Sequence, residues 1–89
     1  MKAVVTVIGK DKVGILAKVS TVCAEHNANV LDVTQSVLQE LFTMVMLIDI
    51  SALSTEFLQL QKALHALGEQ LDMKILVMHE DIFNSMHHI

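Results

Sequence analysis

The spacing of apolar positions changes along the chain, and each change marks the boundary of an expected secondary-structure element. Residues 2–8 (KAVVTVI) are rich in β-branched side chains, which favour a strand. A polar break follows, with Asp11 placed to cap a helix. From Val13 the apolar spacing becomes three and four residues, which predicts a helix over residues 13–26. Its core-facing stripe is expected to comprise Val13, Leu16, Ala17, Ser20, Cys23 and Ala24.

From residue 30 onward, the pattern predicts three strands and two helices. Residues 30–38 alternate, which predicts a strand with Leu31, Val33, Gln35 and Val37 on one face. Residues 42–50 predict a longer strand that is apolar on both faces, and residues 73–78 predict the last strand. Residues 54–71 predict a helix with the apolar stripe Phe57, Leu60, Leu64, Leu67 and Leu71. Residues 80–89 predict a short amphipathic helix.

This order of elements predicts an α+β fold, a ferredoxin-like βαββαβ sandwich. It consists of a four-stranded antiparallel sheet with both long helices on one face, plus a short C-terminal helix. No proline, low-complexity run or polar linker interrupts the chain. We therefore expect residues 1–89 to form a single domain, with residues 80–89 as a helical extension.

Composition narrows the classes of function. The net charge is −4 and aromatic residues make up 3%, which argues against nucleic-acid binding. The longest apolar run, residues 44–48, is too short to span a membrane, and one cysteine is typical of a reducing compartment. We therefore expect a cytoplasmic protein. Hydrophobic residues make up 53% of only 89 residues, more than a small monomer readily buries, so we expect self-association.

The residues around the first polar break resemble a known family. A strand that runs into Gly9-x-Asp11-x-x-Gly14-Ile15-Leu16, followed by Asn-Ala-Asn-Val-Leu-Asp-Val, resembles the ACT domain. The chain is similar to small stand-alone ACT proteins and to the ACT portions of glycine-cleavage regulators and formyltetrahydrofolate deformylases. The resemblance implies a homodimer that binds an amino acid or related small metabolite at the loop between the first strand and helix. Without an attached domain to regulate, such a module is expected to act in trans on a partner protein.

The expected ligand-binding residues are Gly9, Asp11, Lys12, Val13, Gly14, Ile15, Leu16 and Asn29. Free amides at the start of a helix suit a ligand carboxylate. Two alternatives stay open at this point: Asp11 only caps the helix, and Gly14 only permits close packing of helix on sheet. Likewise, Lys10, Lys12 and Lys18 either attract an anion or are merely solvated. Asn27 and Asn29 either contact a ligand or only form a turn, and Gln35 either contacts a ligand or bonds a neighbouring backbone group.

No catalytic, metal or cofactor pattern stands out. Cys23 belongs to the apolar stripe of the first predicted helix and is interpreted as a buried structural thiol, and the adjacent His87 and His88 would point about 100° apart on a helix. We therefore expect neither an enzyme nor a metal or cofactor site. The alternative function is a dimeric protein-interaction module with no small-molecule ligand.

Two patterns support the homodimer. The strand over residues 42–50 is apolar on both faces, and the first helix carries a second apolar stripe, Ile15, Val19 and Val22. We expect Ile82, Phe83, Met86 and Ile89 to be buried, either on their own subunit or across the interface.

Overall fold

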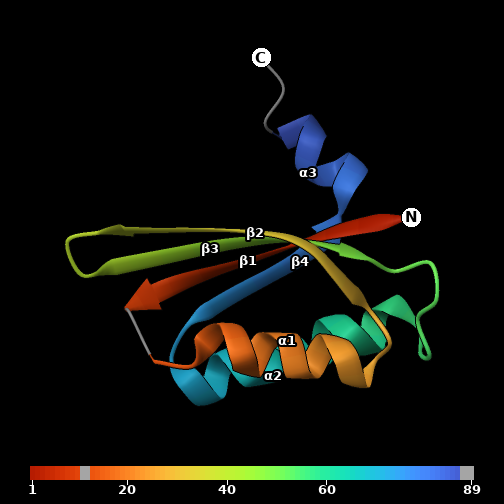
Figure 1. Ribbon diagram of the computed structural model, residues 1–89, viewed down its shortest axis with the longest axis horizontal. Helices are drawn as coiled ribbons and strands as arrows, with labels where there is room; N and C mark the ends of the chain where they lie inside the picture. Colours follow the sequence, from red (N-terminus) through yellow and green to blue (C-terminus); the bar gives the residue numbers. More distant parts are fainter. Residues whose placement is uncertain (11–12, 87–89) are drawn as a thin grey trace.

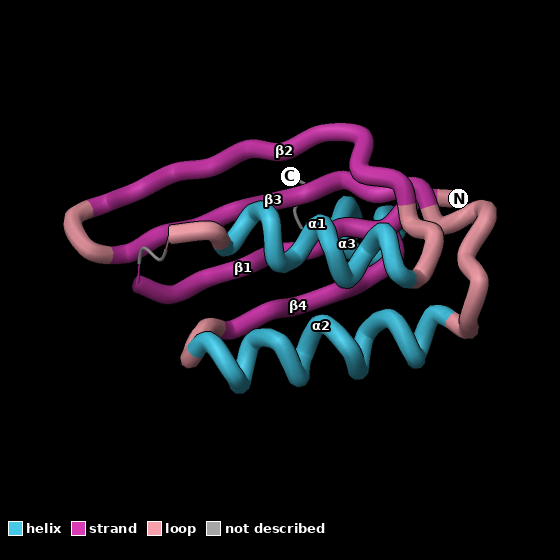
Figure 2. Tube along the Cα trace, turned by 60° about the horizontal axis from the view of Figure 1, so that its bottom comes forward, coloured by secondary structure: helices cyan, strands magenta, loops and turns pink. Residues whose placement is uncertain are grey.

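Strands β1 (Lys2–Lys10) and β3 (Leu41–Asp49) form the centre of an antiparallel sheet in the computed structural model, which describes residues 1–10 and 13–86. The edge strands are β2 (Asn29–Leu38) and β4 (Lys74–His79), so the strand order is β2-β3-β1-β4. Helices α1 (Ile15–Glu25) and α2 (Phe57–Leu71) cover one face of the sheet, and α3 (Glu80–Met86) lies on the other side (Figures 1 and 2). The predicted ferredoxin-like α+β fold is confirmed.

The core lies between the sheet and the two long helices. Alternate residues of β1 and β3 point into it, because successive side chains of a strand face opposite sides. The residues with no exposed surface are Val5, Val7, Met44, Met46, Ile48, Val19, Cys23, Leu60 and Leu64, together with Ala3. The predicted stripe of α2 is confirmed, since Phe57, Leu67 and Leu71 pack against this core at its margins.

The N-terminal part of the first predicted helix was placed wrongly. Helix α1 begins at Ile15 rather than Val13, and Val13 is fully exposed. Its buried face consists of Ile15, Val19 and Cys23, whereas Ala17 and Ala24 of the expected core stripe are exposed. The stripe assigned to a dimer interface is therefore mainly the core face of α1.

Helix α2 also starts later than predicted. It begins at Phe57 with Glu56 as the N-cap residue, three residues after the expected start at Ser54. The Ser54 amide instead donates a hydrogen bond to the carbonyl oxygen of His26 at 3.0 Å. This bond ties the loop before α2 to the end of α1.

A β-bulge changes which side chains of β2 face the core. The register with β3 shifts between Val30 and Asp32, so Val30 and Val33 pack against the core. Leu31, predicted on the same face as Val33, is 44% exposed. Gln35 is also exposed. A bulge adds one residue to one strand and thereby reverses the alternation on either side of it.

The face of the sheet opposite α1 and α2 is largely uncovered. Helix α3 contacts β1 and β4 from this side. Its side chains Ile82 and Met86 are 51% and 65% exposed, so their predicted burial does not occur within one chain. Ile89, part of the same prediction, lies outside the described residues.

The two faces of α2 provide a test of the core. Leu64→Ala removes a fully buried side chain and should lower the free energy of unfolding by about 2–5 kcal/mol. Leu58→Ala, at a position that is 52% exposed, should change it by only about 0.5 kcal/mol. Urea denaturation of both variants measures the difference. Equal losses would contradict the assignment of the buried face.

Candidate functional site

Gly14 sets the geometry of the loop between β1 and α1. It is the N-cap residue of α1 and adopts a left-handed conformation with φ of 82°. A Cβ atom at this position would meet nothing within 4 Å. Gly14 is therefore required for its positive φ, and the alternative that it permits close helix–sheet packing is wrong. The expected N-cap, Asp11, lies three residues earlier and outside the described residues, as does Lys12.

The first turn of α1 has backbone amides that the helix itself does not pair. The first hydrogen bond within the helix runs from the Lys18 amide to the Gly14 carbonyl oxygen, at 3.0 Å. The amides before Lys18 therefore have no partner within the helix, and the N-terminal end of the helix dipole is positive. The side chains of this turn face inward, because Ile15 is buried in the core and Leu16 packs against it.

The other glycine of the predicted site has a packing role. A Cβ atom on Gly9 would lie 2.9 Å from Cγ of Met73, which approaches β1 from the turn between α2 and β4. Gly9 thus lets this turn sit close against the sheet. It remains next to the loop, but its core-facing side is filled by Met73.

Asn29 lies far from the other predicted site residues. It pairs with Asp49, whereas Gly9 pairs with Phe42 near the opposite end of β3. Helix α1 separates the two ends by about 16 Å, at 1.5 Å per residue. Asn27 has a turn role, because it adopts a φ of 60° and its Nδ2 donates to the carbonyl oxygen of Ala52 at 2.7 Å. The structure therefore groups Gly9 with residues 13–16 and leaves Asn29 apart.

The β2–β3 hairpin extends past the start of α1 and forms an overhang that the sequence did not reveal (Figures 1 and 2). Lys10, Val37, Gln39 and Glu40 line a hollow of about 390 Å³ at this end of the sheet. Val37 lies opposite Phe42 on the helix-covered side but is 56% exposed, because it lies beyond the end of the helix layer. We call this region the hairpin hollow.

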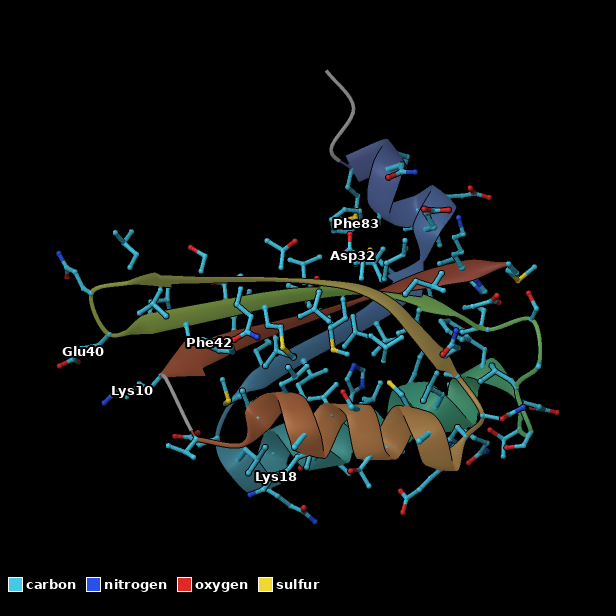
Figure 3. All side chains as sticks on the ribbon, viewed as in Figure 1. Lys10, Lys18, Asp32, Glu40, Phe42 and Phe83 are labelled. Atoms are coloured by element: carbon cyan, nitrogen blue, oxygen red, sulfur yellow. The ribbon has the colours of Figure 1, made fainter. Side chains whose placement is uncertain are left out.

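Charges of both signs lie around this end of the molecule. Lys10, at the end of β1, and Glu40, in the hairpin turn, are exposed at the rim of the hairpin hollow, and their charged groups are directed towards solvent (Figure 3). Lys18 is exposed on the first full turn of α1. The hollow thus combines a cation, an anion and an apolar side chain, and the first turn of α1 lies at the same end of the sheet.

A larger depression of about 580 Å³ lies between the end of α2 and β4. Its shape depends on Gly68, where a Cβ atom would lie 2.7 Å from the Met73 carbonyl oxygen. The Met73 amide donates to the Gly68 carbonyl oxygen at 2.9 Å, which closes the turn. Within residues 1–10 and 13–86, no buried side-chain nitrogen or oxygen lacks a partner, so this depression contains no buried polar side chain left unpaired. A glycine inside a helical pattern was the sequence signal for this turn.

The other side chains that could take part in chemistry, two histidines and the cysteine, are packed or hydrogen-bonded within the fold. His79 stacks on Phe57 with ring centroids 4.2 Å apart, and Nδ1 of His26 lies 2.9 Å from the Val22 carbonyl oxygen. Burial raises the pKa of the Cys23 thiol to about 11. The described part of the chain contains no group of three or more potential metal ligands, and His87 and His88 lie outside it. The same residues include no helix that is long and apolar enough to cross a membrane.

Comparison with known proteins identifies close relatives over the whole described fold. The model of the ACT domain family matches residues 2–78. A UPF0237 protein of Methanocaldococcus jannaschii is 49% identical over 88 residues, which cover 99% of this chain and 98% of the relative. Among solved structures, the chain is similar to an ACT domain protein from Streptococcus pneumoniae. The TM-score is 0.80 and the sequence identity is 42%, with 93% of each chain covered. A formyltetrahydrofolate deformylase from Pseudomonas syringae shares the fold, with a TM-score of 0.77 and 23% identity over 88% of this chain and 27% of its own.

The conformation of Gly14 gives a stability prediction for the loop. Gly14→Val should destabilise the protein by roughly 1–2 kcal/mol, because a β-branched residue strongly disfavours a positive φ. Gly14→Asn should cost clearly less, since asparagine tolerates the left-handed region. Chemical denaturation of both variants measures the two losses. Similar losses would show that φ is not what requires glycine here.

Proposed function

Because the chain belongs to the ACT domain family, we propose that it is a non-enzymatic regulatory module that binds an amino acid or related small metabolite. In this proposal the protein works as a homodimer and acts in trans on a partner protein. The observation that carries the proposal is the hairpin hollow at the end of the sheet where α1 begins. It places opposite charges and an apolar side chain at the same end as the first turn of the helix, whose amides have no partner within the helix.

The chemistry of the hollow suits a zwitterion. The ligand carboxylate would accept hydrogen bonds from the amides of Ile15 and Leu16, with Lys10 supplying a positive charge nearby. Glu40 would pair with the ligand ammonium, and Val37 would contact an aliphatic side chain. Gly14 contributes by exposing the helix amides without a Cβ in front of them. Of the residues expected at the site, Asn29 has no part in it within one chain.

The second candidate function is a dimeric interaction module that binds no small molecule. The observation that favours it is the uncovered apolar face of the sheet, on the side opposite α1 and α2. On this alternative, assembly is the function and the loop before α1 is only a connection. The two candidates differ in whether a small ligand stabilises the protein.

Thermal unfolding in the presence of amino acids and folate-pathway metabolites tests the proposal. A ligand at 100 times its dissociation constant should stabilise the folded state by about 2.7 kcal/mol, because it binds only that state. An absence of stabilisation by every compound at millimolar concentration would favour the interaction module.

Glu40→Gln tests the site separately from the function. This variant should lose the preference for an amino acid over the same acid without its amino group, because the charge facing the ammonium is removed. Glu69→Gln, at the separate depression beside α2, is the matched control and should keep the preference. If a ligand stabilises all three proteins equally, the protein binds it elsewhere.

A further inference from the structure

The uncovered face of the sheet is apolar at its centre. Residues directly opposite each other on neighbouring strands share a face, so the register defines this one. Its central apolar side chains are Val4, Ile8, Val45, Leu47, Leu76 and Met78, with Thr6 and Thr43 between them and Thr34 and Ser36 beside them on β2. Towards the hairpin it continues through Leu38 and Leu41, which are 73% and 49% exposed. We call this surface the open face.

Helix α3 covers only one end of the open face. It follows directly on β4 and contacts β4 and β1, and Val4 at this end is almost completely buried. From there α3 rises away from the sheet, as Figure 1 shows, instead of lying along it. Phe83 lies on the side of α3 turned towards the sheet (Figure 3), whereas Ile82 and Met86 are mostly exposed. One chain therefore leaves two apolar surfaces uncovered: the hairpin end of the open face and the outer side of α3.

We propose that a second copy of this chain packs on the open face, with α3 of each copy covering the hairpin end of the other copy's sheet. The two-fold axis would lie between the sheets and perpendicular to the strands. This inference rests on the homodimer of the proposed function and specifies its interface. A two-fold axis in this direction reverses the strands, so it places the α3 end of one sheet over the uncovered end of the other.

The charges on the open face are arranged for the same pairing. At the α3 end lie four acids and one lysine: Asp32, Asp49, Glu80, Asp81 and Lys2. At the other end, the exposed Lys74 lies on the open face, and the exposed Lys10 lies at its edge together with Glu40, so these three residues carry a net charge of +1. The reversal brings the acidic end of each copy over the basic end of its partner. A parallel stacking of the two sheets would instead place like charges together, which is unfavourable.

A partner with a different surface would not match both the uncovered apolar surfaces and the charges at the two ends of the open face. The uncovered side chains of α3 need an apolar surface, and the hairpin end of the open face offers one beside two lysines. The acids at the base of α3 are attracted to a basic surface, which the lysines at the hairpin end supply. The surface thus complements itself, as the interface of a two-fold dimer requires.

Light scattering during size-exclusion chromatography tests whether the open face is the dimer interface. The wild-type protein should have twice the 9.9 kDa mass of one chain. Leu41→Glu and Ile82→Glu should each raise the dimer dissociation constant by roughly 30-fold or more, the effect expected of a central interface residue. Leu58→Glu is the matched control, because Leu58 on α2 is 52% exposed against 49% and 51% for the other two. It should remain a dimer. Circular dichroism checks that each variant is folded.

The outcomes separate this inference from the proposed function. A monomeric wild-type protein overturns both the homodimer and the open face as its interface. A dimer that persists in Leu41→Glu and Ile82→Glu overturns the open face alone. So does a dimer that dissociates only in Leu58→Glu, since the interface would then involve the helix layer.

Crosslinking tests the two-fold arrangement. A mixture of the Lys10→Cys and Asp81→Cys variants, treated with a short bismaleimide, should give a mixed crosslinked dimer in higher yield than either variant alone. Cys23 does not compete, because it is fully buried and its thiol pKa is raised to about 11. Lys10→Cys mixed with Leu58→Cys is the control and should give little product. A yield no higher than this control would overturn the reversed packing.

Discussion

The domain depends on one constraint: its central strands are apolar on both faces, but its two long helices cover only one of them. The covered face provides the core, where each fully buried aliphatic side chain such as Leu60 or Met46 contributes about 1.5–3 kcal/mol. The other face has the same strands but only a seven-residue helix at one end. Folding of one chain therefore buries only one of the two apolar faces of the sheet. The proposed dimer would bury the other face, because extensive apolar patches are uncommon on soluble monomers.

Sequence patterns predicted the elements whose periodicity was unambiguous. The alternation around Met44 and Met46 and the leucines of α2 identified the core face correctly, since large apolar residues occur there on a single spacing. In α1 two helical stripes compete, and the small residues Ala17 and Ala24 resembled a core stripe. The true start of that helix depends on the left-handed conformation of Gly14, and the faces of β2 depend on a bulge. Neither feature follows from local hydrophobic spacing.

The candidate site was predictable only in part, for a related reason. The loop around Gly14 was recognised from a contiguous motif, and its glycine does have the conformation that the motif requires. Val37 and Glu40 were missed because the hairpin reaches this end of the molecule only through the register of β2 on β3. The same register carries Asn29 to the opposite end, although it follows the motif closely in sequence. Long-range strand pairing, which sequence spacing does not encode, decides which polar groups meet.

The position of β1 has a consequence for how the domain folds. Residues 2–10 pair on one side with residues 41–49, and residues 3–8 pair on the other side with residues 74–79. The second edge of the first strand is therefore paired only when the last strand of the sheet has been added. Until then the segment Ala3 to Ile8, uncharged and largely β-branched, has an unpaired edge of the kind that seeds intermolecular sheets. Closing such distant contacts slows folding. The native topology then places this segment at the centre of the sheet, where both of its edges are occupied and it is the strand least able to pair with another chain.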